Sequence, residues 1–142
     1  MYESGAINPS SVRGMLEAEK LYEQIRRRRT DYVNVSRNSR LSLEQCKIIK
    51  NYIFYDCHEL SEGYKRFTPD LAMAQSWLRL SERKGDRVLP HDILMLFHEL
   101  QEVNYLIRNT SMHQKEAHSL AEKEYNYSKA VKKYYKGLGI II

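Results

Sequence analysis

The spacing of apolar residues along the chain predicts helices rather than strands. Up to about Arg29, apolar side chains recur at roughly helical intervals after a capping stretch at residues 8–11. A second helix is predicted from the capping box Ser42-Leu43-Glu44-Gln45 to about Tyr55. Thr68-Pro69 is the start signal of a third helix, with the threonine as cap and the proline in the first turn.

Two more helices are expected in the C-terminal half. Pro90 opens a long helix that runs to about Asn109. A further capping box, Ser111-Met112-His113-Gln114, indicates the start of a fifth helix. We expect this last helix to extend toward Lys136, where two glycines follow and stop it.

The segments between these helices are predicted to be loops. Residues 31–41 are rich in asparagine and serine, and Val33 and Val35 would make at most a short extended piece. Residues 56–67 contain Gly63 and many polar side chains. We find no convincing strand alternation, no glycine-rich phosphate loop and no repeat of fixed period.

The expected fold class is therefore all-α, a single-domain bundle of about five helices. We assign residues 1–142 to one helical domain, with a core at residues 36–136 and the helix at 10–30 as a linker or accessory helix.

Composition narrows the class of protein. A chain of 142 residues fits one domain and can bury a core without disulfides or a structural metal; 42% hydrophobic and 29% charged residues are typical of a soluble globular protein. No apolar run approaches the ~18 residues that span a bilayer, and the first ten residues do not resemble a signal peptide. Cys46 and Cys57 lack a C-x-x-C spacing, so both are expected to be reduced and structural.

Basic residues form two clusters in a chain of net charge +5. Four arginines occupy positions 26–29, where positive charge also suits the end of a helix. In the second cluster, lysines alternate with tyrosines, a pattern that suits nucleic acid, although a solvated helix face with inward tyrosines is the favoured interpretation. That cluster comprises Lys123, Lys129, Lys132, Lys133 and Lys136 with Tyr125, Tyr127, Tyr134 and Tyr135.

The strongest candidate for chemistry lies in the fourth predicted helix. Ile93 to Phe97 are five consecutive apolar residues, which cover every face of a helix and should lie in the middle of the core. His98, Glu99 and Glu102 follow directly and are expected to be buried. A buried carboxylate needs a partner, a metal ion or a shifted pKa, because removing its charge from water is costly.

His98 and Glu102 are four residues apart and project from one helix face, while Glu99 points to an adjacent sector. His118 is the natural partner from the fifth helix, because a short connection makes the two helices antiparallel. The pattern His-Glu-x-x-Glu is similar to the His-Glu-x-x-His helix of zinc peptidases, with glutamate in place of the second histidine. Two functional interpretations stay open: proton exchange between the histidines, and a divalent ion held by His98, Glu102 and His118. The structural alternatives are a satisfied core network of His98, Glu99 and Glu102, and a surface His118 bonded to Glu122.

A rival constellation is Arg108-Asn109-Thr110-Ser111-Met112-His113. Ribonucleases of the higher-eukaryote-and-prokaryote nucleotide-binding class, also all-α, carry a motif similar to it. There the arginine would stabilise charge on the phosphorane and the histidine would handle protons, without a metal. A helix end followed by the first turn of the next helix explains the same residues more simply.

Several ordered blocks resemble a family of C-terminal toxin domains of bacterial polymorphic toxins, which include Rhs-type, contact-dependent inhibition and phage-head-like carriers. The resemblance spans about residues 36–136. It rests on Ser36-Arg37-Asn38, residues 48–60, residues 63–67, residues 74–80, residues 92–102, Ala117-His118 and Tyr125-Asn126-Tyr127.

The resemblance implies an antibacterial toxin that is secreted or delivered as part of a larger carrier, acts in the target-cell cytoplasm and is blocked by a cognate immunity protein. Such modules are most often nucleases, so we expect phosphodiester cleavage, of RNA before DNA. A metal-dependent hydrolase of peptide or another bond is the second hypothesis, and a non-enzymatic helical binding module is the third. The expected catalytic residues are His98, Glu99, Glu102 and His118, with His58 and Arg66 holding the phosphate.

Overall fold

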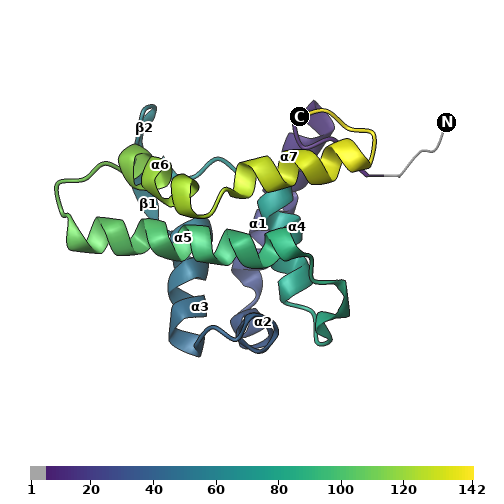
Figure 1. Ribbon diagram of the computed structural model, residues 1–142, viewed down its shortest axis with the longest axis horizontal. Helices are drawn as coiled ribbons and strands as arrows, with labels where there is room; N and C mark the ends of the chain where they lie inside the picture. Colours follow the sequence, from purple (N-terminus) through teal and green to yellow (C-terminus); the bar gives the residue numbers. More distant parts are fainter. Residues whose placement is uncertain (1–5) are drawn as a thin grey trace.

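The longest helix, α5, lies in the middle of the structure. The computed structural model describes residues 6–142 and is predominantly helical, as expected, but it has seven α-helices in this range instead of about five. Figure 1 shows α6 and α7 along one side of α5 and α3 on the other. The elements are α1 (Val12–Arg27), α2 (Asp31–Ser39), α3 (Leu43–Lys50), η1 (Asn51–Tyr55), β1 (Cys57–Leu60), β2 (Gly63–Arg66), α4 (Leu71–Leu80), η2 (Gly85–Arg87), α5 (Pro90–Arg108), α6 (Gln114–Glu124) and α7 (Tyr127–Gly137).

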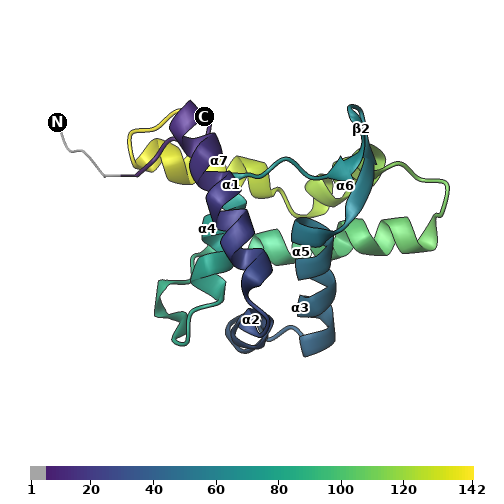
Figure 2. The ribbon, with the colours of Figure 1, turned by 180° about the vertical axis from the view of Figure 1, so that it is seen from behind.

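The core forms where α1, α3, α4 and α5 meet. Tyr22 from α1 packs edge-on against Phe54, which packs in turn against Trp77 from α4 at a ring distance of 5.6 Å. Seen from behind, α1 crosses α4 and leads into α2 (Figure 2). Because Tyr22 and Ile25 are fully buried in this cluster, α1 belongs to the same core as the rest of the chain.

The prediction of a loop at residues 31–41 was wrong, because this segment contains helix α2. Asp31 and Val35 lie four residues apart on its buried face. The Asp31 carboxylate accepts hydrogen bonds from Lys50 Nζ at 2.6 Å and Trp77 Nε1 at 2.8 Å. These contacts with distant residues stabilise a helix whose asparagines and serines disfavour it locally.

The prediction of a loop at residues 56–67 was also wrong, because Cys57–Leu60 and Gly63–Arg66 form an antiparallel hairpin. Gly63 has a φ of 121°, which favours glycine at the turn. Before the hairpin, the helix ends in a π turn, η1, closed by a hydrogen bond from Asp56 N–H to the Asn51 carbonyl at 2.8 Å. The strands are too short and, on β2, too exposed to produce an alternating pattern.

Two predicted helix starts were displaced. Helix α4 is capped by Asp70, whose Oδ1 accepts from Met73 N–H at 3.0 Å, so Thr68-Pro69 precedes the helix. Helix α6 has His113 as its N-terminal cap, and the capping box predicted from Ser111 does not form.

The fifth predicted helix is two helices, because the chain breaks at Tyr125 and Asn126. The Asn126 side chain accepts a hydrogen bond from Lys129 N–H at 3.0 Å and so caps α7. The break leaves the Tyr125 carbonyl outside any helical hydrogen bond, pointing at α5. Gly139 follows α7 with a φ of 81°.

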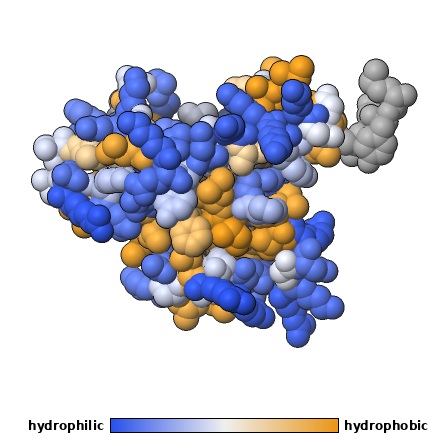
Figure 3. Space-filling view, viewed as in Figure 1, coloured by the Kyte–Doolittle hydropathy of each residue, from blue (hydrophilic) through white to orange (hydrophobic). Residues whose placement is uncertain are grey.

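The surface of the α6–α7 side is mainly polar, with apolar side chains gathered along α5 and toward α3 (Figure 3). Within the predicted apolar run, Met95 and Leu96 are fully buried, whereas Ile93, Leu94 and Phe97 are half-buried. Among residues 6–142, no helix is both long enough and apolar enough to cross a bilayer.

Both cysteines are free thiols, but their environments differ. Cys46 is buried in the core, and Cys57 is exposed on β1.

Candidate metal centre

The α5–α6 pair brings the predicted ligands together. Residues 109–113 connect the two helices and let α6 pack against the C-terminal part of α5, as Figure 1 shows. His98 and Glu102 lie one turn apart on the face of α5 that α6 covers, and His118 reaches them from α6. His98 is 2% exposed and Glu102 is 1% exposed, which confirms the expected burial.

Three donor atoms form a small triangle. His98 Nε2 lies 2.7 Å from Glu102 Oε2, His118 Nδ1 lies 2.9 Å from the same oxygen, and the two nitrogens are 3.1 Å apart. Ligands bound at the usual Zn²⁺ distances are separated by roughly 3.3 Å in a tetrahedral site. A slight expansion of this triangle would therefore seat an ion above its plane.

Groups outside the triangle hold the ligands in orientation. His98 Nδ1 lies 2.9 Å from the Tyr125 carbonyl oxygen, the one freed by the break between α6 and α7. The second carboxylate oxygen of Glu102 accepts hydrogen bonds from the Tyr52 hydroxyl at 2.7 Å and from Gln114 Nε2 at 3.0 Å. Such outer hydrogen bonds to ligating histidines and carboxylates are typical of protein metal sites.

The position of the ring hydrogen on His98 favours a cation in the triangle. The Tyr125 carbonyl can only accept, so His98 Nδ1 carries the hydrogen. In a neutral ring, Nε2 then directs a lone pair at the ionised Glu102 oxygen. Only a proton or a metal ion between the two atoms makes that contact favourable.

The pKa shifts agree with this requirement. Burial alone would raise the pKa of Glu102, but hydrogen bonds from His118, His98 and Tyr52 lower it to about 2. The hydrogen bond to Glu102 raises the pKa of His118, which burial opposes. In the protein without an ion, the raised pKa of His118 thus favours a proton on its imidazole beside the Glu102 carboxylate.

Glu99 behaves in the opposite way. Burial, with repulsion from Glu102, Asp70 and Glu122, raises its pKa well above the ordinary range. Glu99 is 6% exposed, and no residue in the range 6–142 gives it a hydrogen bond. A buried carboxyl with a raised pKa beside the triangle is a candidate for proton transfer.

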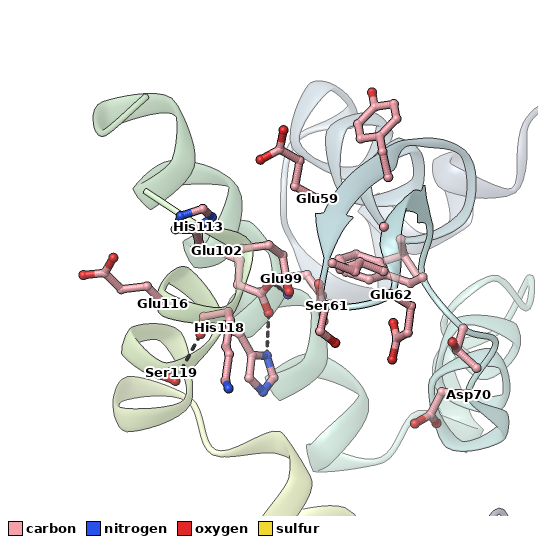
Figure 4. Close-up of a pocket in the computed structure, with 18 of the residues that line it drawn as sticks. Glu59, Ser61, Glu62, Asp70, Glu99, Glu102, His113, Glu116, His118 and Ser119 are labelled. Carbon is pink, nitrogen blue, oxygen red and sulfur yellow. Dashed lines mark hydrogen bonds and ion pairs between the residues drawn. The ribbon is translucent and has the colours of Figure 1, made fainter. Parts of the chain in front are cut away.

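Glu99, Glu102 and His118 line one wall of an open pocket of about 1210 Å³. Its other walls come from the β1–β2 hairpin, the start of α4 and the start of α6. Figure 4 shows His118 and Glu102 pointing toward one another, with Glu99 beside them and the hairpin facing them across the pocket.

Glu122 is a further acidic neighbour. Its Oε2 lies 3.4 Å from His98 Nδ1 and 3.6 Å from His118 Nε2, and this oxygen is buried with no hydrogen-bond partner in the described part of the chain. Its spacing of four residues from His118 is a signal that the sequence carries. No sequence signal points to Tyr52, Gln114 or the Tyr125 carbonyl as members of the site.

The structure does not bring the other two candidate catalytic residues to the triangle. His58 stacks on Phe67 at a ring distance of 4.0 Å, and its Nε2 lies 2.9 Å from the Tyr52 carbonyl oxygen. Arg66 is exposed on β2 and donates to the Tyr55 carbonyl at 3.2 Å. His58 contacts Tyr52 and the pocket residue Phe67, but neither His58 nor Arg66 lines the pocket.

The two basic clusters and the Arg108–His113 pair make contacts that the fold alone explains. Arg26 donates to the Phe54 carbonyl at 2.6 Å at the end of α1. Tyr127 and Tyr135 are buried while the α7 lysines are exposed, as the interpretation of a solvated helix face predicts. Arg108 and His113 are both exposed, and within residues 6–142 no hydrogen bond or ion pair joins them.

Comparison of the chain with protein-family models, with curated proteins and with solved structures finds no match.

Proposed function

We propose that the protein is a divalent-metal-dependent hydrolase whose ion is held by His98, Glu102 and His118. The observation that carries the proposal is the triangle of two imidazole nitrogens and one carboxylate oxygen at the wall of an open pocket. Two histidines and a glutamate form the ligand set of several catalytic zinc sites, in which a fourth position stays open. A divalent ion held there would polarise the scissile bond and activate water.

The residues around the triangle have distinct roles in this proposal. Tyr52 and Gln114 hold the Glu102 carboxylate, and the Tyr125 carbonyl fixes the His98 ring. With an ion bound, its positive charge would favour the ionised form of Glu99, which would accept a proton from the attacking water and pass it to the leaving group as the old bond breaks. The raised pKa of Glu99 makes its ionised form a stronger base than an ordinary carboxylate.

The toxin role, the carrier, the immunity protein and the nuclease activity remain predictions from the resemblance. The geometry favours a hydrolase of non-phosphate bonds over a nuclease. His58 and Arg66, which were expected to hold phosphate, lie outside the pocket.

The first test measures metal content. After dialysis against Zn²⁺, Mn²⁺ or Fe²⁺, mass spectrometry should find one tightly bound ion per chain in the wild type. His118→Ala should weaken affinity at least about 100-fold through loss of a ligand. His113→Ala, at the start of the same helix but outside the triangle, is the matched control and should keep the ion.

The second measurement is hydrolysis of peptide and ester substrates by the same samples. Glu99→Gln should keep the ion yet lower kcat by at least about 100-fold, because the proton acceptor is lost. Failure to bind any ion, or cleavage of RNA in excess chelator, would contradict the proposed function.

A further inference from the structure

The pocket beside the triangle is strongly acidic, in a chain that is basic overall. The sequence has 23 lysines and arginines against 18 acidic residues. Among the residues of the range 6–142 that line the pocket, only Lys115 is a lysine or arginine. The acidic residues there are Glu59, Glu62, Asp70, Glu99, Glu102 and Glu116.

These carboxylates come from several elements and surround the pocket. Glu59 is on β1, Glu62 is in the hairpin turn, Asp70 caps α4, and Glu116 is on α6. Figure 4 shows Glu116 on one side of the pocket and Glu62 and Asp70 on the other. Even with a divalent ion at the triangle and Lys115 counted, the pocket remains negative.

The buried side chain of Glu99 provides a second observation. It is more than nine-tenths buried, lines the pocket and has no hydrogen-bond donor within residues 6–142. Among residues 6–142 the enclosed side-chain atom without a hydrogen-bond partner is Glu122 Oε2, so the Glu99 oxygens reach the open pocket, where a ligand can supply hydrogen bonds. A ligand with charged hydrogen-bond donors, such as an ammonium or guanidinium group, suits these oxygens and the surrounding carboxylates better than a phosphate does.

Aromatic rings add to this chemistry at the hairpin. Tyr64 lines the pocket with 74% of its surface exposed, and Phe67 lines it with its ring held against His58. Exposed aromatic faces beside carboxylates suit the guanidinium of arginine or the ammonium of lysine. At the rim, Glu62 and Lys65 form an exposed contact of 3.9 Å, which solvent screens and which leaves the Glu62 carboxylate accessible to a ligand.

We infer that the pocket takes a positively charged peptide segment, with lysine or arginine side chains held by the carboxylates of the hairpin and α6. The inference rests on the proposed function and names its substrate class. It also means that the site selects against RNA and DNA, whose phosphates the pocket carboxylates repel.

The test is a binding measurement that does not require turnover. Fluorescence anisotropy of the metal-free wild-type protein would compare three peptides of equal length, rich in arginine, serine or glutamate, with a single-stranded RNA. The arginine peptide should bind at least about 10-fold tighter than the others at low salt, and added salt should weaken it. A protein of net charge +5 would otherwise favour the RNA, so the expected order opposes the overall charge.

Matched variants assign the effect to the pocket. Glu59→Gln with Glu62→Gln should weaken binding of the arginine peptide by about 3- to 10-fold. Glu19→Gln with Glu44→Gln changes the charge equally at exposed sites on α1 and α3 and should leave binding unchanged.

The outcomes separate the two proposals. Equal or tighter binding of RNA, or equal losses in both double variants, would overturn the substrate class. Selective binding of the arginine peptide supports the substrate class. This holds even if the metal assay fails and so contradicts the hydrolase proposal. If both proposals hold, the Zn²⁺-loaded protein should cleave the arginine peptide and not the glutamate peptide.

Discussion

Glu99 and Glu102 lie three residues apart on the same helix, yet their carboxyl groups have opposite properties. Glu102 accepts hydrogen bonds from His118, His98 and Tyr52, which keep its pKa at about 2. Glu99 has burial without donors, so its pKa is raised. Pairs of carboxyls whose surroundings separate their pKa values commonly divide catalytic work between a charged group and a proton carrier.

Replacement of Glu99 by glutamine should stabilise the metal-free protein at neutral pH. The folded-state pKa of Glu99 is raised above its ordinary value of 4.5, so the folded state binds more protons than the unfolded chain above that pH. The wild type therefore loses stability as pH rises, by up to about 1.4 kcal/mol per unit, until Glu99 ionises in the folded state. Glu99→Gln removes this loss, and urea unfolding at pH 5 and pH 8 measures it.

The expected gain over wild type is about 1 to 3 kcal/mol at pH 8 and much less at pH 5. Glu19→Gln, an exposed carboxylate on α1, is the control and should stay within about 0.5 kcal/mol at both values. A gain that does not depend on pH would refute the account of Glu99 as a desolvated acid.

At the scale of elements, the break between α6 and α7 matters most for the site. In an unbroken helix, the Tyr125 carbonyl would accept from the backbone N–H of Lys129. The Asn126 side chain takes that N–H instead, and the carbonyl accepts from Tyr127 N–H at 2.9 Å and faces His98 Nδ1. The helix break and the orientation of the first imidazole ligand are thus one structural feature.

Asn126→Ala should lower both stability and metal affinity. Loss of the cap costs about 1 kcal/mol of the free energy of unfolding. The displaced Tyr125 carbonyl should weaken ion affinity by about 10-fold, as loss of an outer contact to a ligand commonly does. Chelator competition and urea unfolding measure the two effects.

Ser42→Ala removes a cap of the same kind from α3, where Ser42 Oγ accepts from Gln45 N–H at 3.0 Å. This control should lose similar stability with no change in ion affinity. Asn126→Asp, which keeps the capping oxygen, should restore both quantities. Equal ion affinity in Asn126→Ala and wild type would show that the break has no role in the site.

The sequence predicted elements wherever local signals were sufficient. The capping box at Ser42 and Gln45 forms, and α5 starts at Pro90 as expected. Helix α2 was missed because its stabilising partners, Lys50 and Trp77, are distant in sequence. A local pattern cannot show such contacts.

At the scale of the whole molecule, an ion at the triangle would join α5 to α6. His98 and Glu102 could be predicted as neighbours because they are four residues apart, and His118 because a short connection follows α5. The contact between Tyr52 and Glu102 could not be predicted, because it depends on the π turn that follows α3 and contains Tyr52. A π turn contains one more residue than an α-helical turn, and the spacing of apolar residues does not reveal it.

Zn²⁺ should therefore stabilise the folded protein as a whole. At a free concentration of about 1,000 times Kd, a ligand that binds only the folded state adds about 4 kcal/mol to the free energy of unfolding. Thermal unfolding with increasing Zn²⁺ measures this as a rising Tm. His118→Ala should show little rise.

Mg²⁺ is the matched control ion, because it prefers oxygen ligands and suits two imidazoles poorly. It should leave Tm nearly unchanged. An equal rise with Mg²⁺, or a full rise in His118→Ala, would place the stabilising ion elsewhere.

The two thiols differ in exposure, and this difference allows one of them to be labelled selectively. Burial raises the pKa of the Cys46 thiol, whereas Cys57 is open to solvent on the strand that forms one side of the pocket. A maleimide dye or nitroxide should therefore attach to Cys57 alone, without any mutation. With paramagnetic Mn²⁺ or Co²⁺ added, such a label would report where the ion sits and whether the hairpin shifts when a ligand arrives.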